Sequence, residues 1–408
     1  MFRKAILLLI LSNSASALTF QSCVESLNQS NPELLSARES LSSQEELAKG
    51  AYSAFFPTVN ASIGMSRNTP NRVLEPQYSG ALSVSYNLFS GLRDRARVRI
   101  ARANLEIARA NLDSVRARVS FLLRQAFAQS VYARENIALT RGIRERRAQN
   151  ERLVRAQYET GRENEGSYLV SKGLLEQAIY DERVARDQAV IAAQNLAHVL
   201  GYDSTEPTAE GEVPSENPPD GVEVEALLRL TPAYRTQLAK IDLAEASFES
   251  ARSGFFPSLD LAGTLSTLGN QPTFQDRKQL GIGLTLTIPL FSGLSTFRDT
   301  RSASALQEVA HQNQVSINFE TLTNLRQALF TYQQSLQKLK VDLGLMNAAT
   351  VRATIARKRY NHGLLAFEQW DIIETDLINR QKNALASKRD RIIAESNYRQ
   401  VQGLGDAP

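Results

Sequence analysis

The chain has 408 residues, of which 22% are charged and 42% are hydrophobic, a composition typical of a folded protein with one large or two to three ordinary domains. The formal charge of +4 is small for this length and argues against dedicated nucleic-acid binding. The single cysteine, Cys23, excludes an internal disulfide. The histidines are scattered, and the sequence has no phosphate loop, zinc-ligand spacing or nucleophile elbow. We therefore predict no catalytic site, no cofactor and no metal site.

The first 17 residues have the pattern of a secretory signal peptide. Arg3 and Lys4 form a basic start, residues 5–11 are apolar, and residues 15–17 are small, as at a cleavage site. The apolar run is too short to span a bilayer, and no stretch of about 18 apolar residues follows. We expect residues 1–17 to be removed from an exported protein. The alternative is an uncleaved anchor, but the chain has no stop-transfer segment.

The chain is a tandem repeat. The triplet Phe-Phe-Pro at 55–57 recurs at 255–257, and Leu-Phe-Ser-Gly-Leu at 88–92 recurs at 290–294. A Tyr-x-x-Gly motif at 158–161 likewise recurs at 360–363, so the offset stays between 200 and 202 residues. Such constancy over several motifs is the signature of a repeat architecture. We predict repeat 1 at 18–202, a Pro-rich linker at 203–222 and repeat 2 at 223–408.

Each repeat begins with a helical stretch, at 33–53 and 233–253, which a proline ends. Two segments with alternating apolar and polar residues follow, joined by loops that contain Pro, Asn or Gly. We therefore predict β-hairpins at 58–89 and 258–291. Pro289 lies within the last predicted strand but cannot donate a ladder hydrogen bond, which is typical of a strand end or a bulge.

A long helix follows each hairpin. Residues 92–157 contain no proline and one glycine, and their apolar residues recur with the three- and four-residue spacing of a coiled coil. The second long helix has the same spacing between Leu322 and Met346. Gly161 and Gly363 end these helices, and a helix of about 40 residues follows each of them. At 1.5 Å per residue a long helix extends roughly 100 Å, about the summed length of the two shorter helices of a repeat.

The alternation in the hairpins predicts strands with one apolar and one polar face, the pattern of a lipid-facing barrel around a watery lumen. Four strands are too few to close a barrel, and open edges are not tolerated in hydrocarbon. Three protomers would contribute twelve strands. The alternative is a soluble β-sandwich, or a small sheet that covers the end of the helices.

Taken together, these motifs resemble the TolC-like outer-membrane efflux protein family, also called outer membrane factors. The similarity covers residues 18–405 and includes Asn31-Pro32, the Phe-Phe-Pro triplets, the segment 288–294 and the Tyr-x-x-Gly motifs. It implies a mainly α fold with a small antiparallel β part: a long α-helical coiled-coil barrel and a 12-stranded β-barrel, assembled from three protomers with tandem structural repeats.

The resemblance also implies a function. The chain would be a homotrimer in the outer membrane of a Gram-negative-type bacterium, in contact with outer-membrane lipid and extending into the periplasm. There it would dock a periplasmic adaptor (a membrane fusion protein) and an inner-membrane pump, as the passive channel of a tripartite efflux or type I secretion system. It would not be an enzyme.

The resemblance assigns roles to two sets of residues. The periplasmic tip, where adaptors dock in this family, corresponds to Tyr158, Gly161, Tyr360 and Gly363. A plain helix stop, with tyrosines packed in the coiled coil, explains the same residues. The transitions between helix and strand correspond to Pro57, Gly91, Pro257 and Gly293, because proline ends a helix and glycine permits unusual dihedral angles.

The family often narrows its tunnel with aspartates past the second tip, but the corresponding positions here are Gln369 and Ile372. Acidic residues lie nearby at positions 368, 371, 374 and 376. Because Trp370, Ile373 and Leu377 form an apolar helix stripe, we expect a different face to point into the pore. That candidate constriction consists of Glu368, Gln369, Ile372 and Asp376. The alternative is a solvated helix surface.

The start of the first long helix carries a basic series: Arg93, Arg95, Arg97, Arg99 and Arg102. Interspersed acids in an exported chain favour a solvated face or a positive pore lining over nucleic-acid binding. Two other functions remain as alternatives: an exported coiled-coil tether or adhesin without a channel, and a hydrolase within a helical scaffold. Ion conductance by the purified protein distinguishes a channel from both.

Overall fold

The computed structural model describes residues 18–68, 75–202, 207, 209–217, 223–269 and 277–406, so the predicted signal peptide and part of the predicted linker lie outside the described residues. The chain divides into two compact units. The helical unit comprises Met1–Ala37, Asp113–Thr231 and Thr321–Pro408, and the strand-bearing unit comprises Arg38–Leu112 and Pro232–Glu320. Across the described ranges, no helix combines the length and apolarity needed to cross a membrane.

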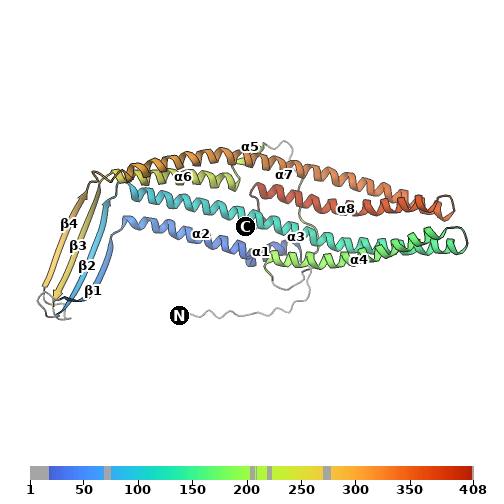
Figure 1. Ribbon diagram of the computed structural model, residues 1–408, viewed down its shortest axis with the longest axis horizontal. Coiled ribbons are helices and arrows are strands. Elements are labelled where there is room, and N and C mark those ends of the chain that lie inside the picture. The colour runs from blue at the N-terminus through green and yellow to red at the C-terminus, as the bar shows by residue number, and fades with distance from the viewer. Residues whose placement is uncertain are drawn as a thin grey trace. The chain divides into compact units, whose positions relative to one another are not determined.

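Helices and strands follow the same order in both halves of the chain (Figure 1). The first half contains α1 (Phe20–Ser30), α2 (Pro32–Gly50), the 3-10 turn η1 (Ala51–Phe55), β1 (Thr58–Asn68), β2 (Glu75–Phe89), α3 (Arg93–Glu159) and α4 (Glu165–Leu200). The second half contains α5 (Val224–Leu228), α6 (Pro232–Arg252), η2 (Ser253–Phe255), β3 (Ser258–Gly269), β4 (Arg277–Thr287), α7 (Ser295–Asn361) and α8 (Phe367–Val401). The predicted tandem repeat and the mainly α fold class are thus confirmed.

The four strands form one antiparallel sheet in the order β1-β2-β3-β4, in which β2 pairs with β3 and so joins the hairpins of the two repeats. Because side chains alternate along a strand, the register sorts them by face. One row on the apolar face contains Ala61, Leu82, Leu265 and Leu280. The adjacent row on the polar face contains Asn60, Ser83, Thr264 and Gly281.

The last strand is shorter than the sequence pattern predicts. The alternation of leucine and isoleucine continues to Leu290, but β4 ends at Thr287. Pro289 explains the difference, because it has no backbone N–H to donate to a ladder. In the first repeat, which has no proline at the matching position, β2 continues to Phe89.

The long helices α3 and α7 each contain 67 residues, rich in alanine, leucine and arginine, which favour helix formation. In the helical unit, α7 packs on α8 and α5 through Leu325, Leu329, Tyr332, Tyr398 and Val224. The first part of the predicted heptad seam of α7 therefore belongs to the core, whereas its last residues, Leu343 and Met346, are only partly buried. In the strand-bearing unit, the amide of Gln237 on α6 donates to the Ala310 carbonyl of α7 at 2.8 Å.

Two helices were not predicted. The first, α1, buries Phe20, Cys23, Val24 and Leu27, which have the spacing of one helix face. Thr19 caps its N-terminus by accepting a hydrogen bond from the Ser22 N–H at 3.3 Å. Burial raises the pKa of the Cys23 thiol to about 11, so this cysteine is protonated and unreactive at neutral pH. The second, α5, has only five residues.

Candidate functional site

The transitions from strand to helix have the same unusual backbone in both repeats. Gly91 and Gly293 adopt left-handed φ angles of 66° and 64°. The following residues, Leu92 and Leu294, are also left-handed, with φ of 72° and 68°. Two consecutive left-handed residues reverse the chain sharply, and the leucines do so at a steric cost that glycine avoids. The glycines have the predicted geometry, but the leucines were not anticipated.

The two glycines differ in their surroundings. A Cβ atom added at Gly91 would lie 2.7 Å from the Ser253 carbonyl oxygen and 2.9 Å from the Phe256 Cβ. A Cβ added at Gly293 would meet nothing within 4 Å. The first junction therefore packs directly against η2, whereas the second is open within the strand-bearing unit.

The prolines act at the transition from helix to strand. Phe56 and Phe256 are extended, with ψ of 149° and 154°, as expected for residues that precede proline. The strands begin one residue after Pro57 and Pro257. Both phenylalanine N–H groups donate to a serine carbonyl three residues earlier at 3.0 Å, which closes the 3-10 turn.

The basic series at the start of α3 is partly engaged in contacts. Arg99 donates to Glu249 at 2.5 Å and lies 3.4 Å from Glu245, both on α6. Arg102 donates to the Tyr52 hydroxyl, and its guanidinium lies 5.7 Å from that ring centroid. These two arginines therefore hold other elements of the strand-bearing unit against α3, while Arg93 and Arg95 are exposed.

Both predicted tips are helical hairpins closed by the same hydrogen bonds. At the first, the Gly161 N–H donates to the Tyr158 carbonyl and the Arg162 N–H to the Gln157 carbonyl, at 2.9 and 2.8 Å. At the second, the N–H groups of Gly363 and Leu364 make the equivalent bonds. Both glycines are left-handed, with φ of 70° and 71°. This is the Schellman motif that the position of the glycines predicts.

The tyrosines of the two tips have different environments. Tyr158 is half-exposed and stacks on Tyr168, with ring centroids 5.5 Å apart. Tyr360 is only 2% exposed and stacks on Trp370 at 4.2 Å. Burial, and secondarily Glu163, which accepts a hydrogen bond from its hydroxyl, raise the pKa of Tyr360 well above the usual range. Tyr360 is therefore a core residue of the second hairpin.

The two tips also differ in the charge and polarity of their residues. Glu159, Arg162, Glu163 and Glu165 make the first tip charged, and the Asn164 side chain caps α4. The second tip has Asn361, His362 and an exposed Leu364, and Ala366 offers α8 no side-chain cap. An open groove of about 890 Å³ lies beside it, lined by residues of both tips, including Arg162, Glu163, His362 and Gln369.

The candidate constriction face is exposed in the protomer. Glu368, Gln369 and Ile372 are exposed, whereas Asp376 is half-buried and pairs with Arg380 at 3.2 Å and with Arg352 at 3.8 Å. On the other face of α8, Trp370 and Leu377 of the predicted apolar stripe are buried and Ile373 is partly buried. The division of α8 into these two faces agrees with the sequence pattern, while the pore-facing role remains a prediction.

Two nearby acids are occupied by arginines of the same chain. Glu374 is buried and accepts from Arg357 on α7 at 2.8 Å. Asp371 accepts from Arg147 on α3 at 2.5 Å, and Arg147 also donates to Thr375 at 2.9 Å. Burial lowers the pKa of the neighbouring Arg146. These acids therefore belong to the packing between helices, which leaves Glu368 as the exposed acid of this turn.

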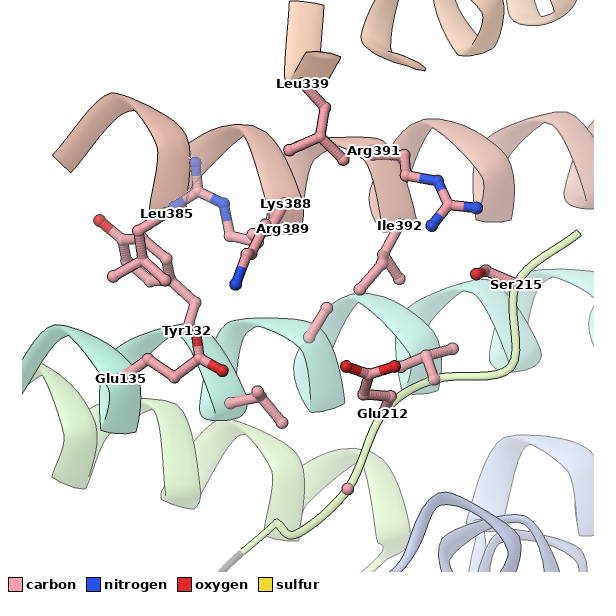
Figure 2. A pocket seen from close by; sticks show the side chains of 14 residues that line it. Tyr132, Glu135, Glu212, Ser215, Leu339, Leu385, Lys388, Arg389, Arg391 and Ile392 are labelled. Atoms are coloured by element: carbon pink, nitrogen blue, oxygen red, sulfur yellow. The ribbon is translucent and has the colours of Figure 1, made fainter. Parts of the chain in front are cut away.

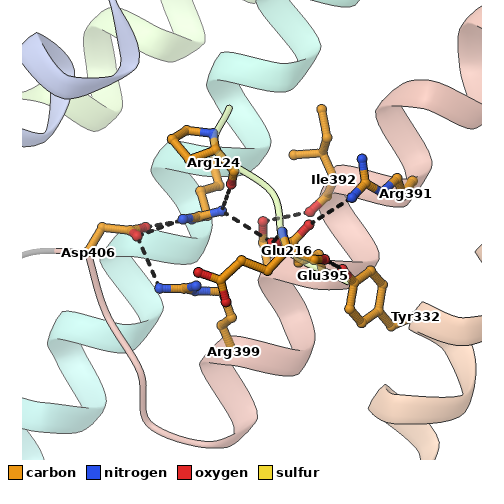
Figure 3. Close-up of polar contacts among 10 residues, drawn as sticks. Arg124, Glu216, Tyr332, Arg391, Ile392, Glu395, Arg399 and Asp406 are labelled. Atoms are coloured by element: carbon orange, nitrogen blue, oxygen red, sulfur yellow. Dashed lines mark hydrogen bonds and ion pairs between the residues drawn. The ribbon is translucent and has the colours of Figure 1, made fainter. Parts of the chain in front are cut away.

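A polar cluster that the sequence did not predict fastens the linker and the C-terminal segment to α3. Arg124 is 4% exposed and donates two hydrogen bonds to the Asp406 carboxylate, at 2.6 and 2.7 Å (Figure 3). It donates a third to the Pro214 carbonyl of the linker at 2.9 Å. On the far side, Glu395 of α8 accepts from the Glu216 N–H at 3.1 Å.

A small pocket lies between the linker, α3 and α8 (Figure 2). Lys388, Arg389 and Arg391 of α8 line one wall, and Glu135 of α3 and Glu212 of the linker line the other. The Arg389 guanidinium lies 4.5 Å from the ring centroid of Tyr132. The pocket volume of about 250 Å³ is below the range of roughly 300–1,000 Å³ that small-molecule sites occupy. We therefore assign it to the packing of the linker.

Comparison with known proteins places these features in context. A family model described as outer membrane efflux protein matches residues 23–202 and 224–404, one segment in each repeat. The alkaline protease secretion protein AprF of Pseudomonas aeruginosa is 24% identical over 283 residues. That alignment covers 67% of this chain and 57% of AprF, so the chain spans little more than half the length of this curated relative.

Solved structures share the fold over nearly the whole chain. A crystal structure of CusC superimposes with a TM-score of 0.86 at 18% identity and covers 97% of this chain and 96% of its own. The outer membrane protein VceC of Vibrio cholerae superimposes with a TM-score of 0.82 at 18% identity, covering 95% and 96%. At such low identity these similarities establish the fold.

Proposed function

Because the chain belongs to the outer membrane efflux protein family, we propose that it is the outer-membrane channel component of a tripartite efflux or type I secretion system. Three copies assemble into a channel that conducts substrates passively from the periplasm to the exterior. The chain acts as a conduit and not as an enzyme. Energy comes from an inner-membrane pump, since the sequence contains no phosphate-binding loop.

The observation that carries this proposal is the sheet. Among the described residues, β1 and β4 each pair on one side only, so both edges of the sheet are open. Its apolar face is uncovered, with Ile63, Leu280 and Ile282 exposed by 80%, 72% and 78%. An uncovered apolar face is unfavourable in water, and open edges are not tolerated in lipid, so the sheet must close with further copies. Closure with two more protomers gives twelve strands around a polar lumen.

Exposed apolar side chains on the helical unit support the same assembly. On α4 these are Leu169, Val170, Ile179, Tyr180, Val190 and Ile191. On the described part of α7 in this unit they include Phe330, Val341, Leu345, Val351 and Ile355. A monomer rarely exposes so many large apolar residues along two helices, whereas they suit contacts between protomers.

The two hairpin tips are the proposed docking surface for the periplasmic adaptor. Tyr158 and Gly161 at one tip, and Gly363 at the other, hold rigid turns, while Tyr360 anchors the second turn from within. Leu364 is 67% exposed at the second tip and offers an apolar contact for a partner. An exported tether or adhesin explains the helices equally well but gives no reason for an uncovered apolar sheet.

Imaging and conductance together test the channel. We expect detergent-extracted protein to appear by negative-stain electron microscopy as threefold particles, and to conduct ions in a planar bilayer. The reason is that sheet closure needs three protomers and leaves a polar lumen. Compact monomers, or rods that conduct nothing, would reject the channel and favour the tether.

Substitution of Gly363 by proline tests docking. Proline cannot adopt the left-handed φ of 71°, and it removes the N–H that bonds to Tyr360, so the turn must rearrange. We expect trimers that conduct normally but lose cross-linking between a photoreactive group at position 364 and a periplasmic adaptor, identified by mass spectrometry. Gly142→Ala, in open space within α3, serves as the control. Unchanged cross-linking of Gly363→Pro would contradict tip docking.

A further inference from the structure

The polar face of the sheet carries very little charge. Its register positions hold mainly serine, threonine, asparagine, glutamine, alanine and glycine, and Asp260 on β3 is the one charged residue among those whose side chains are described. The other charged side chains described in the strands, Arg67 and Lys278, pair with Pro76 and Thr267, which places them on the opposite face at the loop end.

Asp260 lies near the helix end of the sheet and is held in place by its neighbours. It pairs with Asn87 of the neighbouring strand β2 and with Thr285 of the neighbouring strand β4, so the three residues form one row of the polar face. The Asn87 amide donates to the Asp260 Oδ1 at 2.6 Å, and the Ser258 hydroxyl donates to its Oδ2 at 3.4 Å. Both contacts orient the carboxylate without neutralising it.

No cation within the described residues pairs with this carboxylate. The salt bridges of the strand-bearing unit lie on its helices, and none of them includes Asp260. The Asn87 Oδ1 is also buried and has no hydrogen-bond donor among the described residues. The row therefore carries a negative charge that no cation among the described side chains compensates.

The space in front of this row is open. A Cβ added at Gly281 or at Gly283, the polar-face residues of β4 next to Thr285, would meet no heavy atom within 4 Å. Small residues therefore leave room for hydrated ions to pass close to Asp260. Rings of carboxylates in such a pore select cations, because their potentials add at the axis.

We propose that Asp260 determines the ion selectivity of the channel, three copies forming a carboxylate ring that favours cations over anions. The inference rests on the proposed trimeric channel, and it adds a specificity-determining residue. It opposes one of the two interpretations of the arginine series on α3, a positive pore lining, which would favour anions. In that series Arg99 and Arg102 have partners while Arg93 and Arg95 are exposed, and the Asp260 carboxylate faces no cation among the described side chains.

The test is the reversal potential of purified trimers in a planar bilayer under a KCl gradient. At about 0.1 M salt we expect Asp260→Asn to lower the permeability ratio of K⁺ to Cl⁻ about two- to fivefold, because three charges act within roughly one Debye length of the axis. The difference shrinks at about 1 M salt, where the Debye length is about 3 Å. A purely structural role for Asp260 predicts no such salt dependence.

A substitution that adds a negative charge provides a second test of the proposal. Thr285→Asp adds a carboxylate to the same row and is expected to raise the ratio of K⁺ to Cl⁻ permeability. Glu46→Gln, on α2, removes an equal charge outside the sheet and is expected to leave the ratio unchanged. If Asp260→Asn does not assemble, the permeability ratio of Thr285→Asp alone tests the proposal.

The outcomes separate this inference from the proposed function. Normal conductance with the same permeability ratio in wild type, Asp260→Asn and Thr285→Asp at low salt would overturn the carboxylate ring but leave the channel intact. A wild-type protein that conducts nothing would overturn the channel and the ring together. A lowered ratio in one variant and a raised ratio in the other supports both.

Discussion

Replacing Arg124 with methionine is expected to lower the free energy of unfolding by about 3–5 kcal/mol, the usual cost of removing one partner from a buried ion pair. The guanidinium is 4% exposed and donates hydrogen bonds to Asp406 and to the Pro214 carbonyl. It also forms an ion pair with the Glu395 carboxylate at 3.9 Å. Methionine occupies a similar volume but leaves both carboxylates without this partner. Urea unfolding followed by circular dichroism measures the loss.

Arg118 provides a matched control on the same helix. It pairs with Glu33, but both side chains are more than one-third exposed, so Arg118→Met is expected to cost no more than about 1 kcal/mol. Limited proteolysis provides a local readout. We expect Arg124→Met, but not Arg118→Met, to release the linker and the C-terminal segment, and therefore to be cleaved faster near Pro214. Equal stability of the two variants would show that Arg124 does not fasten these segments.

The elements that were predicted correctly have local sequence signals. The hairpins are visible because side chains alternate with period two and turn residues separate the strands. The long helices are visible because they lack proline and end at Gly161 and Gly363, whose left-handed conformation only glycine adopts readily. The repeat strengthens each of these signals, because a motif in one half of the chain has a counterpart in the other half.

The contacts that were missed join distant parts of the chain. Arg124 and Asp406 are separated by 282 residues, and Arg147 and Asp371 by 224. No local pattern specifies such pairs, although an arginine between Leu123 and Phe127, on the apolar side of α3, already indicates a buried charge that needs a partner. For the same reason the sequence shows Asp371 and Glu374 only as acids near the candidate constriction, whereas the structure pairs both with arginines.

The helix α1 was missed for another reason. Its apolar residues follow the spacing i, i+3, i+4 and i+7, so the signal was present, but the segment is only 11 residues long and directly follows the predicted signal peptide. The left-handed leucines at 92 and 294 had no such signal, because leucine rarely adopts this conformation.

Alanine substitution of the two junction glycines is expected to give unequal results despite their equivalent places in the repeat. Gly293→Ala should cost roughly 1–2 kcal/mol, the strain of a left-handed residue with a side chain. Gly91→Ala should cost roughly 3–4 kcal/mol, because overpacking adds to the same strain. Its added Cβ would lie 2.7 Å from the Ser253 carbonyl oxygen, a backbone atom that cannot rotate away.

Hydrogen exchange localises this difference. If the clash displaces η2, exchange at the Phe256 N–H, which donates to Ser253 at 3.0 Å, accelerates in Gly91→Ala and stays slow in Gly293→Ala. Equal stability and equal exchange in the two variants would mean that the first junction does not pack against η2 in solution. Because the φ angles of the two junctions agree within a few degrees, any inequality between the variants measures this packing contact and not the turn itself.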